Sequence, residues 1–188
     1  MRFVRQHAKR FGVDPDRIGG VGGSSGAHLV GLVAALGASG TADDSDPVGR
    51  QPATLQCVVL VAGPGDLAKM IGTSGIATAA VVSFLEHGPT PDAQKIYRAA
   101  SPITHVSPST PPALLIHGDA DETVPFQQSL DMEAALRATQ VPVKLVRVPG
   151  GTHGADFGRG GTPHLQFQDV LKEAIGWLDR YLKAPKQP

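Results

Sequence analysis

The chain contains the residue types that together turn a serine hydroxyl into a nucleophile. Ser24 comes first, a pair of aspartates, Asp119 and Asp121, follows, and His153 comes last. A serine hydroxyl is a poor nucleophile near neutral pH unless an imidazole takes its proton, and the imidazole needs a carboxylate to fix its tautomer and stabilise its charged form. These residues in this order indicate acyl transfer by a serine hydrolase, with either aspartate available as the acid.

A glycine-rich segment surrounds the candidate nucleophile. Residues 22–26 read Gly-Gly-Ser-Ser-Gly, after a strand-like run at 17–21 and before an apolar helical run at 27–36. This is the context of a nucleophile elbow, in which the glycines avoid collisions with the neighbouring strand and helix, and the helix N-terminus stabilises negative charge at the serine. The same five residues could also form an ordinary glycine-rich turn between a strand and a helix.

Strands and helices are expected to alternate along the chain. Apolar runs typical of buried strands occupy residues 55–62 and 113–117, a strand-like run occupies 17–21, and residues 143–148 alternate with the period of two that is typical of a strand. Helices are expected at residues 3–11, 27–36, 127–139 and 164–182, with a further helical piece at 76–87 inside an otherwise irregular stretch, 66–112. This alternation predicts an α/β fold, with right-handed βαβ units and a parallel sheet covered by helices on both faces.

The expected strands lead directly into the candidate site residues. The strand at 17–21 is followed by Ser24, and the strand at 113–117 is followed by both aspartates. The strand at 143–148 is followed by His153. Because functional groups collect at the carboxyl ends of the strands in such sheets, we expect these side chains to lie together at one edge.

Composition and charge exclude several classes of protein. The chain has 188 residues, 41% of them hydrophobic, which suits a domain with a sizeable core. Its 17 basic and 17 acidic residues give a formal net charge of zero, so neither nucleic acid nor an anionic membrane surface is an expected partner. Neither a recurring metal-ligand spacing nor a dinucleotide or phosphate-loop fingerprint is present, so we expect no metal and no cofactor.

Cysteine content and apolar stretches bear on the cellular setting. Cys57 is the single cysteine and lies in an apolar run, where we expect a buried strand thiol and no intramolecular disulfide. The longest apolar stretch is far shorter than the roughly 20 residues that span a bilayer. The first eleven residues favour an amphipathic helix over a signal peptide, so the expected location is cytoplasmic.

Four segments of the chain resemble the α/β-hydrolase esterases. They are residues 17–29, Ala-Ser-Pro-Ile at 100–103, Pro-Ala-Leu-Leu-Ile-His-Gly-Asp-Ala-Asp at 112–121 with Val-Pro at 124–125, and Gly-Thr-His-Gly at 151–154. The similarity is to the group that contains hormone-sensitive-lipase-like and feruloyl-esterase-like enzymes and the catalytic domain of prolyl oligopeptidases.

The resemblance implies a role for each candidate site residue. Ser24 matches the nucleophile, His153 the base and Asp121 the acid, and the amide of Ser25 is implied as an oxyanion donor. Asp119 is expected to bond the backbone of its loop instead, as aspartates in turns commonly do.

The chain departs from the family pattern before the elbow. Such enzymes usually carry several further strands there and a His-Gly-Gly-Gly-type loop that supplies oxyanion N–H groups, and neither precedes Ser24 here. We expect residues 1–188 to form a single domain, the C-terminal half of the usual fold, with about four strands and a lid-like insertion at about 66–100. The elbow strand would then be an open edge, which predicts a homo-oligomer, with a dimer favoured.

These observations predict a carboxylesterase that cleaves short-chain acyl esters of small molecules through an acyl-enzyme. The apolar residues of the insertion could wall the acyl pocket, or they could simply pack on the sheet. Two alternatives stay open. The chain could be a non-catalytic or weakly active remnant that acts as an interaction module, or it could be a peptidase or thioesterase, because the same triad serves any acyl transfer.

Overall fold

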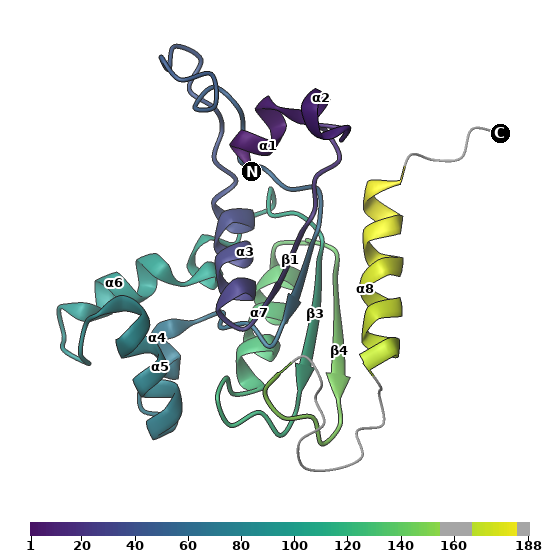
Figure 1. Cartoon of the computed structure of the whole chain (residues 1–188). Helices are drawn as coiled ribbons and strands as arrows, with labels where there is room; N and C mark the ends of the chain where they lie inside the picture. Colours follow the sequence, from purple (N-terminus) through teal and green to yellow (C-terminus); the bar gives the residue numbers. More distant parts are fainter. Residues whose placement is uncertain (155–166, 184–188) are drawn as a thin grey trace.

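The computed structural model describes residues 1–154 and 167–183. Its centre is a sheet of four strands in the order β1-β2-β3-β4, and each neighbouring pair is parallel (Figure 1). The strands are β1 (Gly20–Gly23), β2 (Val58–Val61), β3 (Ala113–Gly118) and β4 (Val143–Val148). The predicted α/β architecture with about four parallel strands is confirmed, and strand order follows chain order.

Helices lie on both faces of this sheet (Figure 1). The α-helices of the described residues are α1 (Arg2–Gln6), α2 (Ala8–Phe11), α3 (Ser25–Leu36), α4 (Leu67–Met70), α5 (Gly75–Leu85), α6 (Ala93–Ala100), α7 (Gln127–Ala138) and α8 (Phe167–Leu182), and a 3-10 turn, η1, spans Pro102–His105. The predicted start of the last helix, at residues 164–166, lies outside the described residues.

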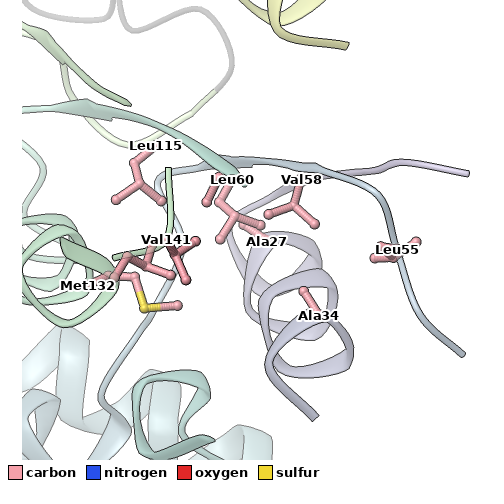
Figure 2. Close-up of a cluster of buried hydrophobic side chains, with 10 residues drawn as sticks. Ala27, Ala34, Leu55, Val58, Leu60, Leu115, Met132 and Val141 are labelled. Atoms are coloured by element: carbon pink, nitrogen blue, oxygen red, sulfur yellow. The ribbon is translucent and has the colours of Figure 1, made fainter. Parts of the chain in front are cut away.

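The two central strands alternate their side chains between two apolar cores. Val58 and Leu60 of β2 pack with Leu115 of β3 against α3 and α7 (Figure 2). On the opposite face Val59 of β2 and Ile116 of β3 pack against α8. A strand buried on both faces needs a continuous apolar run, which explains why the sequences of β2 and β3 show no polar alternation.

The stretch between β2 and β3 contains more helix than the sequence indicated. The predicted piece corresponds to α5, but α4, α6 and η1 are also present, so the expectation of irregular structure is wrong there. Helices α4, α5 and α6 form a separate core, in which Tyr97 of α6 is fully buried with Met70 and Val81. The short length of α4 and the polar residues of α6 hide their helical periodicity from the sequence pattern.

The N-terminal helix is broken in two at His7, which has φ −108° and ψ 23°. Its aromatic side chains are not buried, since Phe3 and Phe11 are 51% and 46% exposed. Arg5 is buried instead, and its guanidinium donates to the carbonyl oxygens of Pro15, at 2.9 Å, and of residues 52 and 54. This arginine ties α1 to the loops below it.

The last helix buries only some of its apolar side chains. Val170 and Trp177 are buried against the sheet, whereas Leu171 and Ile175 are 42% and 56% exposed. None of the helices within residues 1–154 and 167–183 combines the length and apolar character that crossing a membrane requires.

Cys57 is fully buried at the start of β2, as the sequence predicted. Burial raises the pKa of its thiol to about 11. The thiol is therefore protonated near neutral pH and belongs to the core rather than to any reactive site.

Candidate active site

Ser24 occupies a sharp turn between β1 and α3. Its backbone has φ 54° and ψ −123°, a conformation with positive φ that costs a non-glycine residue free energy. The turn is held in place because the Ser24 amide donates to the carbonyl oxygen of Val61 on β2, at 2.8 Å. The strand, turn and helix of the predicted elbow are therefore present, with the hydroxyl raised at the carboxyl end of the sheet.

The two glycines that flank the elbow serve different needs. A Cβ added at Gly22 would lie 2.3 Å from the carbonyl oxygen of Gly26, so the close approach of β1 to α3 requires glycine there. A Cβ added at Gly26 would meet nothing within 4 Å. The expected collision is therefore found at Gly22, and the prediction is wrong for Gly26.

The structure brings Ser24, His153 and Asp121 into one hydrogen-bonded chain. Nδ1 of His153 lies 2.7 Å from Oδ2 of Asp121, and its Nε2 lies 2.9 Å from Oγ of Ser24. Because the carboxylate can only accept, Nδ1 carries the proton and Nε2 accepts from the serine hydroxyl. The three side chains follow the ends of β1, β3 and β4, as parallel topology requires.

Asp121 is held as a buried carboxylate. Its Oδ1 accepts from the amides of Thr123 and Val124, at 2.9 and 2.8 Å, and its side chain has no solvent exposure. Burial alone would raise the pKa of this carboxyl group, but hydrogen bonds from His117, His153 and the Val124 amide outweigh it and hold the pKa below its ordinary value. Asp121 therefore carries its charge beside His153 near neutral pH.

Asp119 lies two residues away and faces other partners. Its carboxylate accepts from Nε of Arg147 and from the amide of Gly150, both at 2.7 Å. The hydrogen bond from Arg147 is the main reason that the pKa of Asp119 lies below its usual value, and the one from Gly150 adds to it. This aspartate ties the loop after β3 to the end of β4 and to the loop after β4, which carries His153.

The N-terminus of α3 is aimed at the same place. Ser25 is the first residue of this helix, and its amide is among those that an α-helix leaves without an intrahelical partner. Together with the helix dipole, such an amide favours negative charge at its end. The Ser25 amide thus belongs to the first turn of α3, directly after Ser24 in the chain, and its role as an oxyanion donor stays a prediction.

Two cavities adjoin Ser24. The smaller has a volume of about 90 Å³ and lies between the elbow and the inserted helices, where Met70, Val81 and Phe84 form apolar walls. The larger has a volume of about 500 Å³ and lies between β1, β2 and α8, with Val21 and His153 on its lining. Ser24 therefore lies between a small and a larger cavity, and both have mainly apolar linings.

Two further histidines contact this region. His28 of α3 is buried, lines the small cavity and has Nε2 2.7 Å from the carbonyl oxygen of Ala100. It thereby joins the elbow helix to the end of α6. His117 has Nε2 2.9 Å from the Val124 carbonyl oxygen, and the same nitrogen also reaches Oδ2 of Asp121 at 3.2 Å. That second contact was not anticipated.

The elbow, the parallel sheet and the order of these residues define the α/β-hydrolase class. The model of the BD-FAE family matches residues 1–136, and the chain belongs to this family.

Several similar proteins of known name are esterases. The chain is 32% identical to esterase LipQ of Mycobacterium tuberculosis over 82% of its own length and 37% of that protein. It is 30% identical to the probable carboxylic ester hydrolase LipM of the same organism, over 84% of this chain and 36% of that protein. The chain thus spans little more than a third of these relatives.

One solved structure has the same fold, and this chain covers a larger share of it than of the two relatives above. The acetyl ester-xyloside bifunctional hydrolase of Caldicellulosiruptor lactoaceticus superposes with a TM-score of 0.80 and 31% identity. The match covers 95% of this chain and 62% of that one. The resemblance to α/β-hydrolase esterases is therefore confirmed for the fold and the family.

Proposed function

We propose that this chain carries the catalytic centre of a carboxylesterase that cleaves short-chain acyl esters of small molecules. The observation that carries the proposal is the hydrogen-bonded chain from Ser24 through His153 to Asp121, at 2.9 and 2.7 Å. The named esterases among its relatives support the same reaction class.

The proposed reaction has two halves. His153 Nε2 takes the hydroxyl proton as Ser24 Oγ bonds the ester carbonyl carbon, and the resulting oxyanion lies against the Ser25 amide. Collapse of this intermediate breaks the bond to the alcohol oxygen, which receives the proton from Nε2 and leaves an acyl-enzyme. Water then gives a proton to Nε2 while it attacks the acyl carbon, and Ser24 departs and regains its proton as the acid is released.

The small cavity supports a preference for short acyl groups. At about 90 Å³ it is far smaller than the roughly 300–1,000 Å³ of sites that hold drug-sized ligands. Its walls come largely from α4 and α5, and Val81 is buried there while Phe84 contacts His28 edge to face. Of the two roles considered for the insertion, these contacts favour that of an acyl-pocket wall.

The assembly is proposed to be a homodimer. Among the strands that the structure describes, β1 has a neighbour on one side, and Val21 in its middle is 57% exposed. Leu171 and Ile175 are exposed on α8, the helix that lines the large cavity together with β1. An open strand edge beside apolar side chains favours pairing with a second, identical surface. A cytoplasmic location stays a prediction from the sequence.

Hydrolysis of a series of p-nitrophenyl esters by the purified protein tests the proposed function. The expected result is turnover of the acetate and butyrate esters that falls steeply for longer acyl chains. Absence of turnover with all of them would contradict the esterase proposal and favour the non-catalytic alternative. Faster turnover of matched thioester or acyl-peptide substrates would instead favour a thioesterase or a peptidase.

A further inference from the structure

A second imidazole, that of His117, contacts the same carboxylate oxygen of Asp121 as His153 does. Nε2 of His117 lies 3.2 Å from Oδ2 of Asp121, and Nδ1 of His153 lies 2.7 Å from the same atom. We infer that His117 is a positioning residue of the catalytic centre, which acts through Asp121 on the orientation and basicity of His153. The inference rests on the proposed esterase function and assigns a role to a residue outside the three-residue chain.

The partners of His117 define its protonation. Nε2 faces the carbonyl oxygen of Val124 at 2.9 Å as well as the Asp121 carboxylate, and both can only accept, so Nε2 carries a proton. Nδ1 lies 2.7 Å from Oγ of Ser129 on α7, and the hydroxyl can donate to it. Nε2 of His117 is therefore assigned as a protonated nitrogen that faces Asp121.

These contacts extend the catalytic chain to α7. Hydrogen bonds run from Ser24 to His153, from His153 to Asp121, from His117 to Asp121 and from Ser129 to His117. His117 and the Asp121 side chain have no solvent exposure, so water cannot replace the lost donor if His117 is changed. Networks of this kind are stronger in a buried setting than in water.

The contact with His117 affects the negative charge that the Asp121 carboxylate presents to His153. The two backbone amides on Oδ1 fix the carboxylate in place, while His117 shares part of the negative charge on Oδ2. Without this donor, Oδ2 presents more charge to His153, and the imidazolium is stabilised further. Of the other acidic residues in the same loop, Asp119 pairs with Arg147 and Glu122 is exposed. Within the described chain, His117 is the histidine besides His153 that contacts Asp121.

A matched pair of variants separates this role from simple packing. In His117→Gln the side-chain amide reaches the place of Nε2 and can still donate to Asp121, whereas in His117→Asn it reaches only the place of Nδ1. We expect His117→Asn to lower kcat on the order of tenfold, as loss of a supporting hydrogen bond commonly does, with KM little changed. The acid limb of its kcat/KM profile should move to higher pH, while His117→Gln stays close to the wild type in both respects.

Two outcomes would overturn the inference. One is an equal loss of activity in both variants without movement of the acid limb, in step with a loss of thermal stability. The other comes from ¹⁵N NMR of the histidines in the wild-type protein, which serves even if a variant does not fold. His117 should carry a proton on Nε2 at neutral pH, and a deprotonated Nε2 would refute the assignment. This measurement is independent of whether esters are hydrolysed, so failure of the inference can be told from failure of the proposed function.

Discussion

The Asp121 carboxylate contacts Nδ1 of His153 at 2.7 Å, although the two residues follow different strands. The parallel pairing of β3 with β4 makes this possible, because His117 lies opposite Arg147 in the register and the two following loops leave the sheet side by side. The pairing of β3 with β4 therefore brings the loop of Asp121 beside the loop of His153.

Exchange of the two aspartates for asparagine should give very different enzymes. Asp121→Asn should lower kcat by up to about 10⁴-fold, because the amide no longer selects the tautomer or stabilises the charged form of His153. Asp119→Asn should cost only a few-fold, since it loses the contact with Arg147 and keeps an oxygen for the Gly150 amide. The measurement is the steady-state kcat of both variants, with circular dichroism to show that each is folded. Greater damage from Asp119→Asn would contradict the assignment of the acid.

The buried charge of Asp121 should also make stability depend on pH. Its pKa lies below the ordinary value of 3.8, so in mild acid the unfolded chain binds the proton more readily than the native state does. The stabilisation is present above about pH 4 and is lost as the pH falls through the folded pKa. Thermal unfolding should show a steeper fall in Tm below about pH 4 for the wild type than for Asp121→Asn, which cannot ionise there. Parallel curves for the two proteins would argue against a lowered pKa.

Enlargement of the small cavity should lengthen the preferred acyl chain. Phe84→Ala removes one of its walls, so kcat/KM for a hexanoate ester relative to the acetate ester should rise by roughly tenfold, the range expected when a pocket gains room for additional methylenes. Ile76→Ala is the matched control, because Ile76 lies on the same helix, is 56% exposed and is not part of the cavity lining. The same change of preference in both variants, or in neither, would show that this cavity does not hold the acyl group.

The open edge of β1 should be covered by a second copy in solution. Sedimentation equilibrium at micromolar concentration should show a dimer for the wild type and a monomer for Val21→Lys, which places a charge on the exposed edge strand. Ile76→Lys introduces the same charge on α5 and should leave the dimer intact. A monomeric wild type that binds no hydrophobic dye would contradict the proposed assembly.

The sequence predicted those parts of the fold whose patterns are local. The buried strands show continuous apolar runs, and residues 143–148 coincide with β4. The elbow could be recognised from its glycines and Ser24, because they form a short motif of neighbouring residues. The roles of Asp119 and Asp121 had to come from a family resemblance, because both follow the same strand and a single sequence cannot show which one faces His153.

Other features depended on contacts between distant segments. The exposure of Ile175 follows from how α8 sits on the sheet, which helical periodicity alone does not fix. Burial of Arg5 depends on carbonyl groups of other segments, including that of Thr54, which lies far away in the chain. The contact of His117 with Asp121 had a partial signal in the spacing of four residues, but only the turn between them, closed by the Val124 carbonyl, brings the ring to the carboxylate.

The most direct test of the central claim is the turnover of p-nitrophenyl acetate by Ser24→Ala beside the wild type. Ser24 donates its hydroxyl proton to His153 and is the proposed site of the acyl-enzyme, so its loss should remove nearly all activity, with a reduction of up to about 10⁶-fold in kcat. His153→Ala should fall to a similar level, because the two residues act as a unit. A folded Ser24→Ala protein that retains more than about a tenth of the wild-type kcat would contradict the account, since triad knockouts leave far less.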